Sequence, residues 1–251
     1  MFFYPSLVCG DYQGPLSENP REGLLQRGRR AYHRGSHVYG TSQRVEGHMT
    51  VGATPATEPR ITWHNAWGHF CTITQHKLLV MRYCWRVGLY RQALAHDISK
   101  YAPSEFLVGA RYYQGHRSPN TAERVAKGYS EAWMHHKGRN KHHTEYWTDI
   151  RGNGDATFEG KPMPTRYVVE MFCDRVAACK VYQGEAYTDR SALDYYELER
   201  TAGPILIHPD TDALLRRLVT MLAEQGEEAT FREIRETIVK PRYFEGEHGR
   251  F

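Results

Sequence analysis

A histidine and an aspartate stand side by side near the middle of the chain, in the segment His96-Asp97-Ile98-Ser99-Lys100. Neutral imidazole and carboxylate are common ligands of borderline divalent metals. Neighbouring residues of a helix point about 100° apart, so both side chains reach one ion only where the helix faces a closed polar centre. Lys100 is placed to contact an anion bound to that metal. The pair predicts a metal site, provided that other segments supply further ligands.

Histidine is concentrated around this segment. Nine of the fourteen histidines lie between His64 and His143, and tracts rich in histidine and acidic residues favour metal binding. The candidate ligands that stand in or between apolar helical patterns are, in chain order, His76, His96, Asp97, one member of His135/His136, one member of His142/His143, and Asp174. Within the two pairs we favour His136 and His143, and His135 and His142 are the alternatives.

Asp174 stands in an otherwise apolar segment, residues 168–178. A buried carboxylate costs several kcal/mol unless it is paired or bound to a cation. Glu170 lies four residues earlier on the same helical face, so two acids there need a cation nearby. The alternatives are a salt bridge from Asp174 to Arg175 or Arg166, or exposure of this face to solvent.

The order H…HD…H…H…D, with one ligand group per successive helix, resembles the HD superfamily of metal-dependent phosphohydrolases. That superfamily carries a first-helix histidine, a His-Asp doublet and a late aspartate, which match His76, His96-Asp97 and Asp174. HDISK is similar to the HD-[ILV]-[GS]-K form of a subgroup that hydrolyses cyclic dinucleotides, although the Gly-Tyr-Pro stretch of that subgroup is absent. The resemblance covers about residues 64–185. Together with the His-rich turn HHKGRNKHH, it looks like an uncharacterised bacterial and phage branch.

The resemblance implies an all-α, HD-domain-like helical bundle that binds one or two divalent ions, of Mn, Fe, Co, Zn or Mg. It implies hydrolysis of a nucleotide or another small phosphate ester by metal-activated water. The implied metal ligands are His76, His96, Asp97, His136, His143 and Asp174. The implied catalytic residues are Asp97 and Lys100, and the implied substrate contacts are Lys100, Arg139, Lys141 and His142.

Two other functions fit the same ligand pattern. One is an HD-type di-iron oxygenase, because some binuclear members of the superfamily activate O2 instead of hydrolysing phosphate. The other is a non-catalytic module that uses a structural metal and the basic turn to bind a nucleotide or a protein. Iron content with oxygen consumption would favour the first, and ligand binding without turnover would favour the second.

Several side chains near the histidines have two interpretations. Trp133, Tyr146 and Trp147 could stack on a base, but packing in the core is the more common role of such rings. Glu105 and Glu145 are candidates for the rim of the site.

The elements that must position these residues are helices. Apolar periodicity predicts them at residues 65–87, 89–100, 104–113, 118–136, 165–182, 192–200, 211–225 and 229–239, with a helical turn at 144–147. Gly226 is expected to end a helix, and the Gly-rich polar range 151–162 predicts a surface loop. No β-alternating segment of useful length is present, so the predicted fold class is all-α.

Composition narrows the functional class. Hydrophobic residues make up 40% and charged residues 25% of the 251 residues, as in soluble globular proteins with a substantial core. A net charge of +4 allows anionic substrates but is too small to indicate a nucleic-acid binder. Five dispersed cysteines without a C-x-x-C pair predict reduced thiols and a cytoplasmic location. No apolar run approaches the ~20 residues of a membrane span. The pattern does not predict an oligomeric state.

Residues 1–60 differ from the rest of the chain. They are rich in Gly and Pro, contain scattered Arg, and contain no lysine, because the first lysine is Lys77. We interpret them as a low-order extension, or as translation from upstream of a true start near Met49. Residues 61–251 are expected to form one HD-like metal-binding domain.

Overall fold

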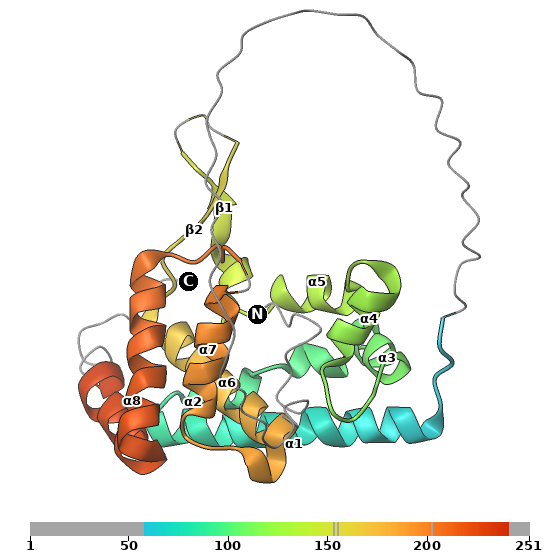
Figure 1. Cartoon of the computed structure of the whole chain (residues 1–251), viewed down its shortest axis with the longest axis horizontal. Coiled ribbons are helices and arrows are strands. Elements are labelled where there is room, and N and C mark those ends of the chain that lie inside the picture. The colour runs from blue at the N-terminus through green and yellow to red at the C-terminus, as the bar shows by residue number, and fades with distance from the viewer. Residues whose placement is uncertain (1–57, 153, 155, 202, 241–251) are drawn as a thin grey trace, which may run out of the picture. The chain divides into compact units, whose positions relative to one another are not determined.

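The structure is a computed structural model, which describes residues 58–152, 154, 156–201 and 203–240. The predicted N-terminal extension lies outside the described residues except for its last three positions. The elements are α1 (Trp63–Val87), α2 (Tyr90–Ala95), η1 (Ile98–Tyr101), α3 (Pro103–Arg111), α4 (Pro119–Lys127), α5 (Glu131–Lys137), η2 (Thr144–Trp147), β1 (Thr148–Ile150), β2 (Phe158–Gly160), α6 (Thr165–Gln183), η3 (Gly184–Ala186), α7 (Ser191–Thr201), α8 (Pro209–Glu233) and η4 (Ile234–Val239) (Figure 1).

The predicted all-α class is confirmed. The strands form one short antiparallel hairpin, in which Thr148 pairs with Gly160 and Ile150 with Phe158. Within the range 151–162, which the sequence predicted as a surface loop, β2 takes Phe158–Gly160, and β1 ends just before the range begins. Three residues per strand are too few to show an alternating pattern, so the sequence carried no signal for it. None of the helices in the described ranges has the length and apolar character required to cross a membrane.

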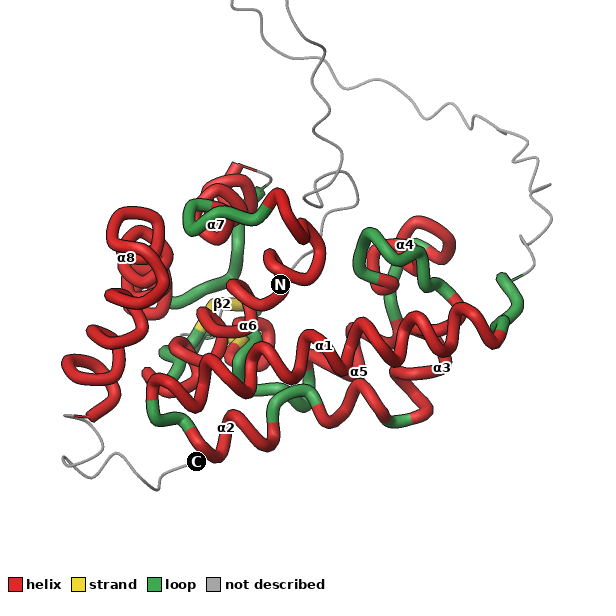
Figure 2. Tube along the Cα trace, turned by 90° about the horizontal axis from the view of Figure 1, so that it is seen from below, coloured by secondary structure: helices red, strands yellow, loops and turns green. Residues whose placement is uncertain are grey.

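Helix α6 lies in the core and contacts α1, α7 and α8. All residues from 168 to 179 are buried, and the fully buried ring of Phe172 lies 5.6 Å from that of Phe231 on α8. Helix α1 contributes Val80 and Cys84 to the same apolar cluster, and it also packs along α2 and α3 (Figure 2). This packing fixes α1 and α6 relative to each other, and therefore fixes the polar side chains that both helices carry.

The His-Asp pair is not helical, contrary to the predicted helix over 89–100. Helix α2 ends at Ala95, and Asp97 takes the left-handed conformation, with φ 53° and ψ 24°. It is the one non-glycine residue with positive φ in the described ranges. Left-handed backbone costs most residues about 1–2 kcal/mol, although Asp tolerates it better than others. The break lets two adjacent side chains face one centre, which a continuous helix would not allow.

A lysine of α1 holds this break in place. The ammonium group of Lys77 donates to the carbonyl oxygens of Leu94 (3.0 Å) and His96 (2.5 Å). These carbonyls stand at the end of α2, where helical carbonyls lack a partner within the helix and a cation is favourable. Lys77 therefore ties the backbone beside Asp97 to the helix that carries His76.

The helix predicted over 118–136 is two helices. Gly128 ends α4 with φ 84°, a conformation that glycine adopts without steric cost. Ser130 then begins α5, since its hydroxyl accepts from the Trp133 backbone N–H at 3.1 Å. The apolar pattern passes through Gly128 without a change of phase, so periodicity alone could not reveal the break.

Gly226 interrupts α8 where the sequence predicted a helix end. Its φ of 77° and ψ of 170° are not helical, yet the chain resumes a helix at once. The next residue, Glu227, accepts from the guanidinium of Arg86 on α1 at 2.7 Å and pairs with Lys180 on α6. The kink therefore places one carboxylate between three packed helices.

Glu227 is expected to stabilise the fold in a pH-dependent way. Burial opposes its ionisation, but the Lys180 and Arg86 cations outweigh burial and lower its pKa below the ordinary 4.5. Because the folded-state pKa is lowered, the stabilisation is present above pH 4.5 and is lost as the pH falls through the folded pKa. We expect Glu227→Gln to lower the free energy of unfolding by about 1 kcal/mol at neutral pH. In urea unfolding this difference should shrink towards zero under acid conditions, and a difference that persists there would contradict the argument.

Candidate metal centre

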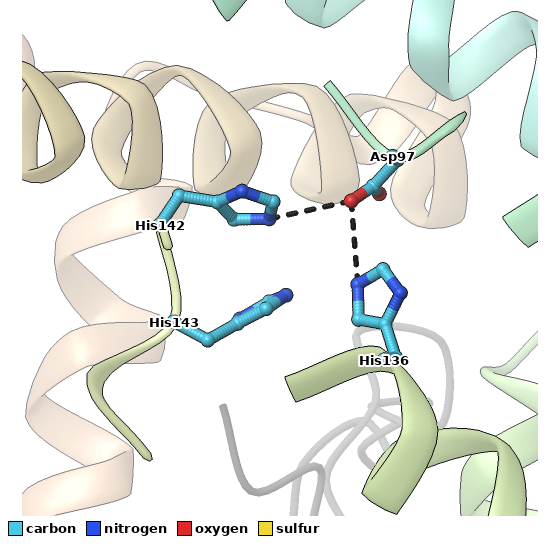
Figure 3. Close-up of side chains that lie close together, drawn as sticks. All are labelled: Asp97, His136, His142 and His143. Carbon is cyan, nitrogen blue, oxygen red and sulfur yellow. Dashed lines mark ion pairs between the residues drawn. The ribbon is translucent and has the colours of Figure 1, made fainter. Parts of the chain in front are cut away.

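Asp97 joins two sets of side chains. It is 1% exposed, and its two carboxylate oxygens face different histidines. Oδ2 lies 3.3 Å from His96 Nε2 and 3.8 Å from His76 Nε2. Oδ1 lies 3.2 Å from His136 Nε2 and 3.4 Å from His142 Nε2 (Figure 3). A carboxylate in this position could bridge two cations.

The first group of potential ligands consists of His76, His96, Asp97 and Asp174. All four residues are buried, and one donor atom from each lies within 4.8 Å of the others. Asp174 Oδ1 lies 2.8 Å from His76 Nε2 and 3.5 Å from His96 Nε2. The group draws on α1, the break after α2, and α6. The predicted resemblance to the HD superfamily rests on these four residues.

The second group consists of Asp97, His136, His142 and His143, again with donor atoms within 4.8 Å of one another. His136 stands in the last turn of α5, while the other two histidines lie in the turn before η2. Figure 3 shows the three imidazoles and the Asp97 carboxylate converging. The sequence predicted one ligand from each histidine pair, but the structure brings both His142 and His143 to the group. The turn permits this because its backbone is not helical.

His135, the alternative to His136, is directed elsewhere. Its Nδ1 contacts Glu105 Oε1 at 2.5 Å and its Nε2 contacts the Ser104 hydroxyl at 3.1 Å, both on α3. Adjacent residues of α5 point in different directions, so only His136 reaches Asp97. The choice of His136 over His135 therefore agrees with the geometry.

Several donor atoms of the centre have no hydrogen-bond partner in the described part of the chain. Apart from Asp97 Oδ2, which Lys100 faces at 2.6 Å, they are His96 Nε2, His142 Nε2, His143 Nε2 and Asp97 Oδ1, and all four are buried. A buried polar atom without a partner costs about 1–3 kcal/mol, so four together in one place require an explanation. Imidazole nitrogen and carboxylate oxygen are suitable donors for a borderline divalent ion, and the residues present therefore fit such an ion.

Two further carboxylates hold the histidines from behind. Glu170 Oε1 lies 3.0 Å from His96 Nδ1 and 3.3 Å from His142 Nδ1, and thus contacts one histidine of each group. Glu105 Oε2 lies 2.8 Å from His136 Nδ1. A carboxylate at Nδ1 favours the tautomer whose Nε2 is free to bind a metal. The sequence marked Glu170 as a neighbour of Asp174 and Glu105 as a rim residue, but not this role.

The centre has an excess of negative charge. Four carboxylates, from Asp97, Glu105, Glu170 and Asp174, are each 1–5% exposed. One lysine faces them, since Lys100 Nζ lies 2.6 Å from Asp97 Oδ2. Four negative charges against one positive charge leave three uncompensated unless histidines are protonated or cations bind. Buried charge of this kind is tolerated only when it is compensated.

The pKa values of the buried groups depend on two opposing effects, which are burial, which disfavours the charged form, and attraction to neighbouring opposite charges, which favours it. Burial opposes a charged His96, but Asp97, Asp174 and Glu170 outweigh burial and hold the pKa of His96 well above its usual range. Burial likewise opposes an ionised Asp97, yet the neighbouring cations hold its pKa well below its usual range. Burial lowers the pKa of His143, which is therefore neutral at neutral pH and able to donate a lone pair.

A cavity that is partly open to solvent lies beside the two groups. His76, His136, His143 and Asp174 line it from the metal centre, and Lys100 joins them. Carboxylates raise the pKa of Lys100 despite its burial, so its ammonium stays charged. An anion in this cavity would contact both the lysine and any cation held by the two groups. We call this space the central cavity.

The structure also brings an arginine that the sequence reasoning missed to the central cavity. Arg117, from the irregular connection between α3 and α4, lines it together with Tyr113 and Tyr182. By contrast, neither Arg139 nor Lys141, which the resemblance implied as substrate contacts, is among the described residues that line this cavity. His142, implied as a substrate contact, lies among the potential metal ligands instead.

The remaining candidates have ordinary surroundings. Trp133 is buried against His143, with ring centroids 4.8 Å apart. Trp147 donates from Nε1 to the Lys141 carbonyl at 2.7 Å. Arg175, a possible salt-bridge partner for Asp174, instead lies 2.7 Å from Glu199. Asp174 is therefore not neutralised by that arginine.

Comparisons with known proteins give one positive result. No curated protein and no solved structure matches the chain. Residues 65–221 match a family described as a family of unknown function (DUF5662). The match begins in α1, ends in α8 and includes every residue of the two ligand groups. It names no activity, so the resemblance to the HD superfamily stays a prediction. Because the matched range is more than half of the chain, the protein belongs to the DUF5662 family.

Proposed function

We propose that this protein is a metal-dependent phosphohydrolase that acts on a nucleotide or another small phosphate ester. The observation that carries the proposal is the set of buried, unpartnered donor atoms around Asp97, next to a cavity that a charged lysine lines. We further propose two divalent ions per chain, because each oxygen of Asp97 faces its own group of histidines.

The chain's own residues would do the following. Asp97, Asp174 and the histidines would hold the ions, which would supply a Lewis acid and lower the pKa of a bound water from about 15.7 towards 7. Lys100 would neutralise phosphate oxygens, as a fixed positive charge stabilises charge on a transferring phosphoryl group. Glu170 and Glu105 would keep the imidazoles oriented. Arg117 stands at the same cavity and could contact a second anionic part of the substrate.

Lys100 favours hydrolysis over the oxygenase alternative. It is a cation in contact with Asp97 and at the wall of the central cavity, and such a charge suits an anionic substrate. The donor set alone does not separate the two reactions, since imidazole and carboxylate ligands also suit iron. The iron form therefore belongs in the test.

The test is turnover by the full chain after chelator treatment and reloading with Mn, Fe(II), Co, Zn or Mg. We expect hydrolysis of a phosphate-ester bond in at least one member of a panel of nucleotides, cyclic dinucleotides and p-nitrophenyl phosphate, only with metal, and chromatography of the products detects it. Lys100→Met should lower kcat/KM at least tenfold, a conservative figure for removing one charge-stabilising group, with metal content unchanged.

The matched control is Lys161→Met, which removes another half-buried lysine from an ion pair, with Glu159 at 2.8 Å. Its turnover should equal that of the unmodified protein. Full metal loading without hydrolysis of any ester of the panel would overturn the proposal. Oxygen consumption by the iron form in place of hydrolysis would point to the oxygenase instead.

A further inference from the structure

A second cavity lies behind the metal centre. It is an open groove of about 1420 Å³, and its basic residues are Arg91 of α2, Arg139 and Lys141 of the turn after α5, and Arg166 of α6. We call it the basic groove. His96, His142 and Glu170 also line it. It shares no lining residue with the central cavity among the described residues. A ligand in the basic groove would therefore occupy a different place from a substrate beside Lys100.

Three cations of the basic groove, those of Arg91, Arg139 and Lys141, lack compensating acids among the described residues. No described carboxylate forms an ion pair with Arg91, Arg139 or Lys141. Many other cations of the fold are paired, as Arg86 and Lys180 are with Glu227. Glu170 is the one carboxylate among the described residues lining the groove, and His96 and His142 already contact it.

Uncharged groups hold these cations at the groove. Lys141 Nζ lies 5.7 Å from the ring centroid of Tyr146 and 5.9 Å from that of Tyr167. The guanidinium of Arg166 lies 4.9 Å over the same Tyr167 ring. Arg139 donates to the His135 carbonyl at 3.2 Å. Ring faces and carbonyl oxygens orient a cation without cancelling its charge, so the charges of Lys141 and Arg139 stay available to a ligand.

We propose that the basic groove is a second anion site, which binds a ligand carrying two or more phosphoryl groups. Arginine and lysine are the side chains that recognise phosphate, through paired N–H donors and through a point charge. One phosphate carries at most two negative charges near neutral pH, fewer than the three unpaired cations of the groove. A diphosphate or triphosphate chain matches both that charge and the length of an open groove lined from several elements.

Inorganic triphosphate is a suitable probe, because it isolates the phosphate chain from any base or sugar. Binding to the full chain is measured by calorimetry with chelator present, so that no metal in the central cavity attracts the probe. We expect saturable binding that weakens as salt is added. The double substitution Arg139→Gln with Lys141→Gln should weaken it at least tenfold. Lys100→Met, which alters only the central cavity, should change it less than twofold.

The matched control is Arg216→Gln with Arg232→Gln, which removes two exposed arginines of α8 and changes the net charge equally. Its affinity should stay within twofold of the unmodified protein. Circular dichroism checks the fold of each variant. If the groove variant does not fold, Arg91→Gln alone should weaken binding at least threefold.

Three results would overturn the second site. One is absence of binding at millimolar triphosphate. Another is equal weakening by the groove variant and the α8 control, which would indicate general attraction to a positive surface. The third is loss of binding in Lys100→Met alone, which would place the probe in the central cavity. Because metal is excluded, failure of this proposal leaves the hydrolase test untouched.

Discussion

Asp97→Ala is expected to remove metal from both ligand groups at once. Each carboxylate oxygen of Asp97 faces a different group, so no other substitution of a single side chain takes a ligand from both. In metal-dependent hydrolases, the class proposed for this protein, metal supplies several kcal/mol of transition-state stabilisation. Since 1.36 kcal/mol corresponds to a factor of ten, turnover should fall by about 1000-fold or more. Elemental analysis after reloading and dialysis measures the metal directly.

Single-histidine variants make this prediction quantitative. His76→Ala should empty the first group, and His136→Ala should empty the second. Each of these variants should therefore retain about half of the metal, whereas Asp97→Ala should lose the metal of both groups. Asp194→Ala is the matched control, because Asp194 also pairs with a basic side chain, Arg190 at 2.8 Å, but on the surface. Unchanged metal content in Asp97→Ala would show that the two groups do not share this ligand.

Glu170→Gln is expected to weaken metal binding in both groups without removing a ligand. The Glu170 carboxylate contacts His96 Nδ1 and His142 Nδ1, one histidine from each group. One oxygen, Oε1, faces both imidazoles, and the uncharged oxygen of a glutamine accepts weaker hydrogen bonds there than a carboxylate oxygen does. Loss of such a partner costs about 10–100-fold in metal affinity, and we expect the upper end because two histidines are affected. Competition with a chromophoric chelator gives the affinity.

The control for Glu170→Gln is Glu123→Gln. Glu123 is also fully buried, and its carboxylate accepts from Ser130 at 2.6 Å, away from both ligand groups. Metal affinity of this variant should match that of the unmodified protein. If both substitutions lowered affinity equally, the effect would come from general loss of stability, and the positioning role of Glu170 would be wrong.

The sequence predicted those ligands of the metal centre that are polar residues within an otherwise apolar helical pattern. His76 and Asp174 stand out for this reason, and the structure buries both beside His96 and Asp97. The turn holding His142 and His143 has no such pattern, so the sequence could not show that both reach the same group. The left-handed backbone of Asp97 was also hidden, because its cost is offset by contacts from distant residues such as Lys77.

Arg139 and Lys141 show a second reason why the site could not be predicted fully from the sequence. They stand between the two histidine pairs, and proximity in sequence suggested proximity to the substrate. In the structure, however, residues 139–142 of the turn all line the basic groove, while His136 and His143 line the central cavity. Helix boundaries were predicted well where glycine ends an amphipathic segment, as Gly88 ends α1. They were missed where glycine lies inside an unbroken pattern, as Gly128 does.

The contact between His76 on α1 and Asp174 on α6 has a consequence for how the protein is made. The two residues are 98 positions apart, and their donor atoms meet at 2.8 Å. A nascent chain on the ribosome carries His76, His96 and Asp97 long before α6 has been translated. The first group therefore cannot be completed until α6 emerges and docks on α1. Metal acquisition at this group should follow translation of α6, which makes loading a late step in the maturation of the protein.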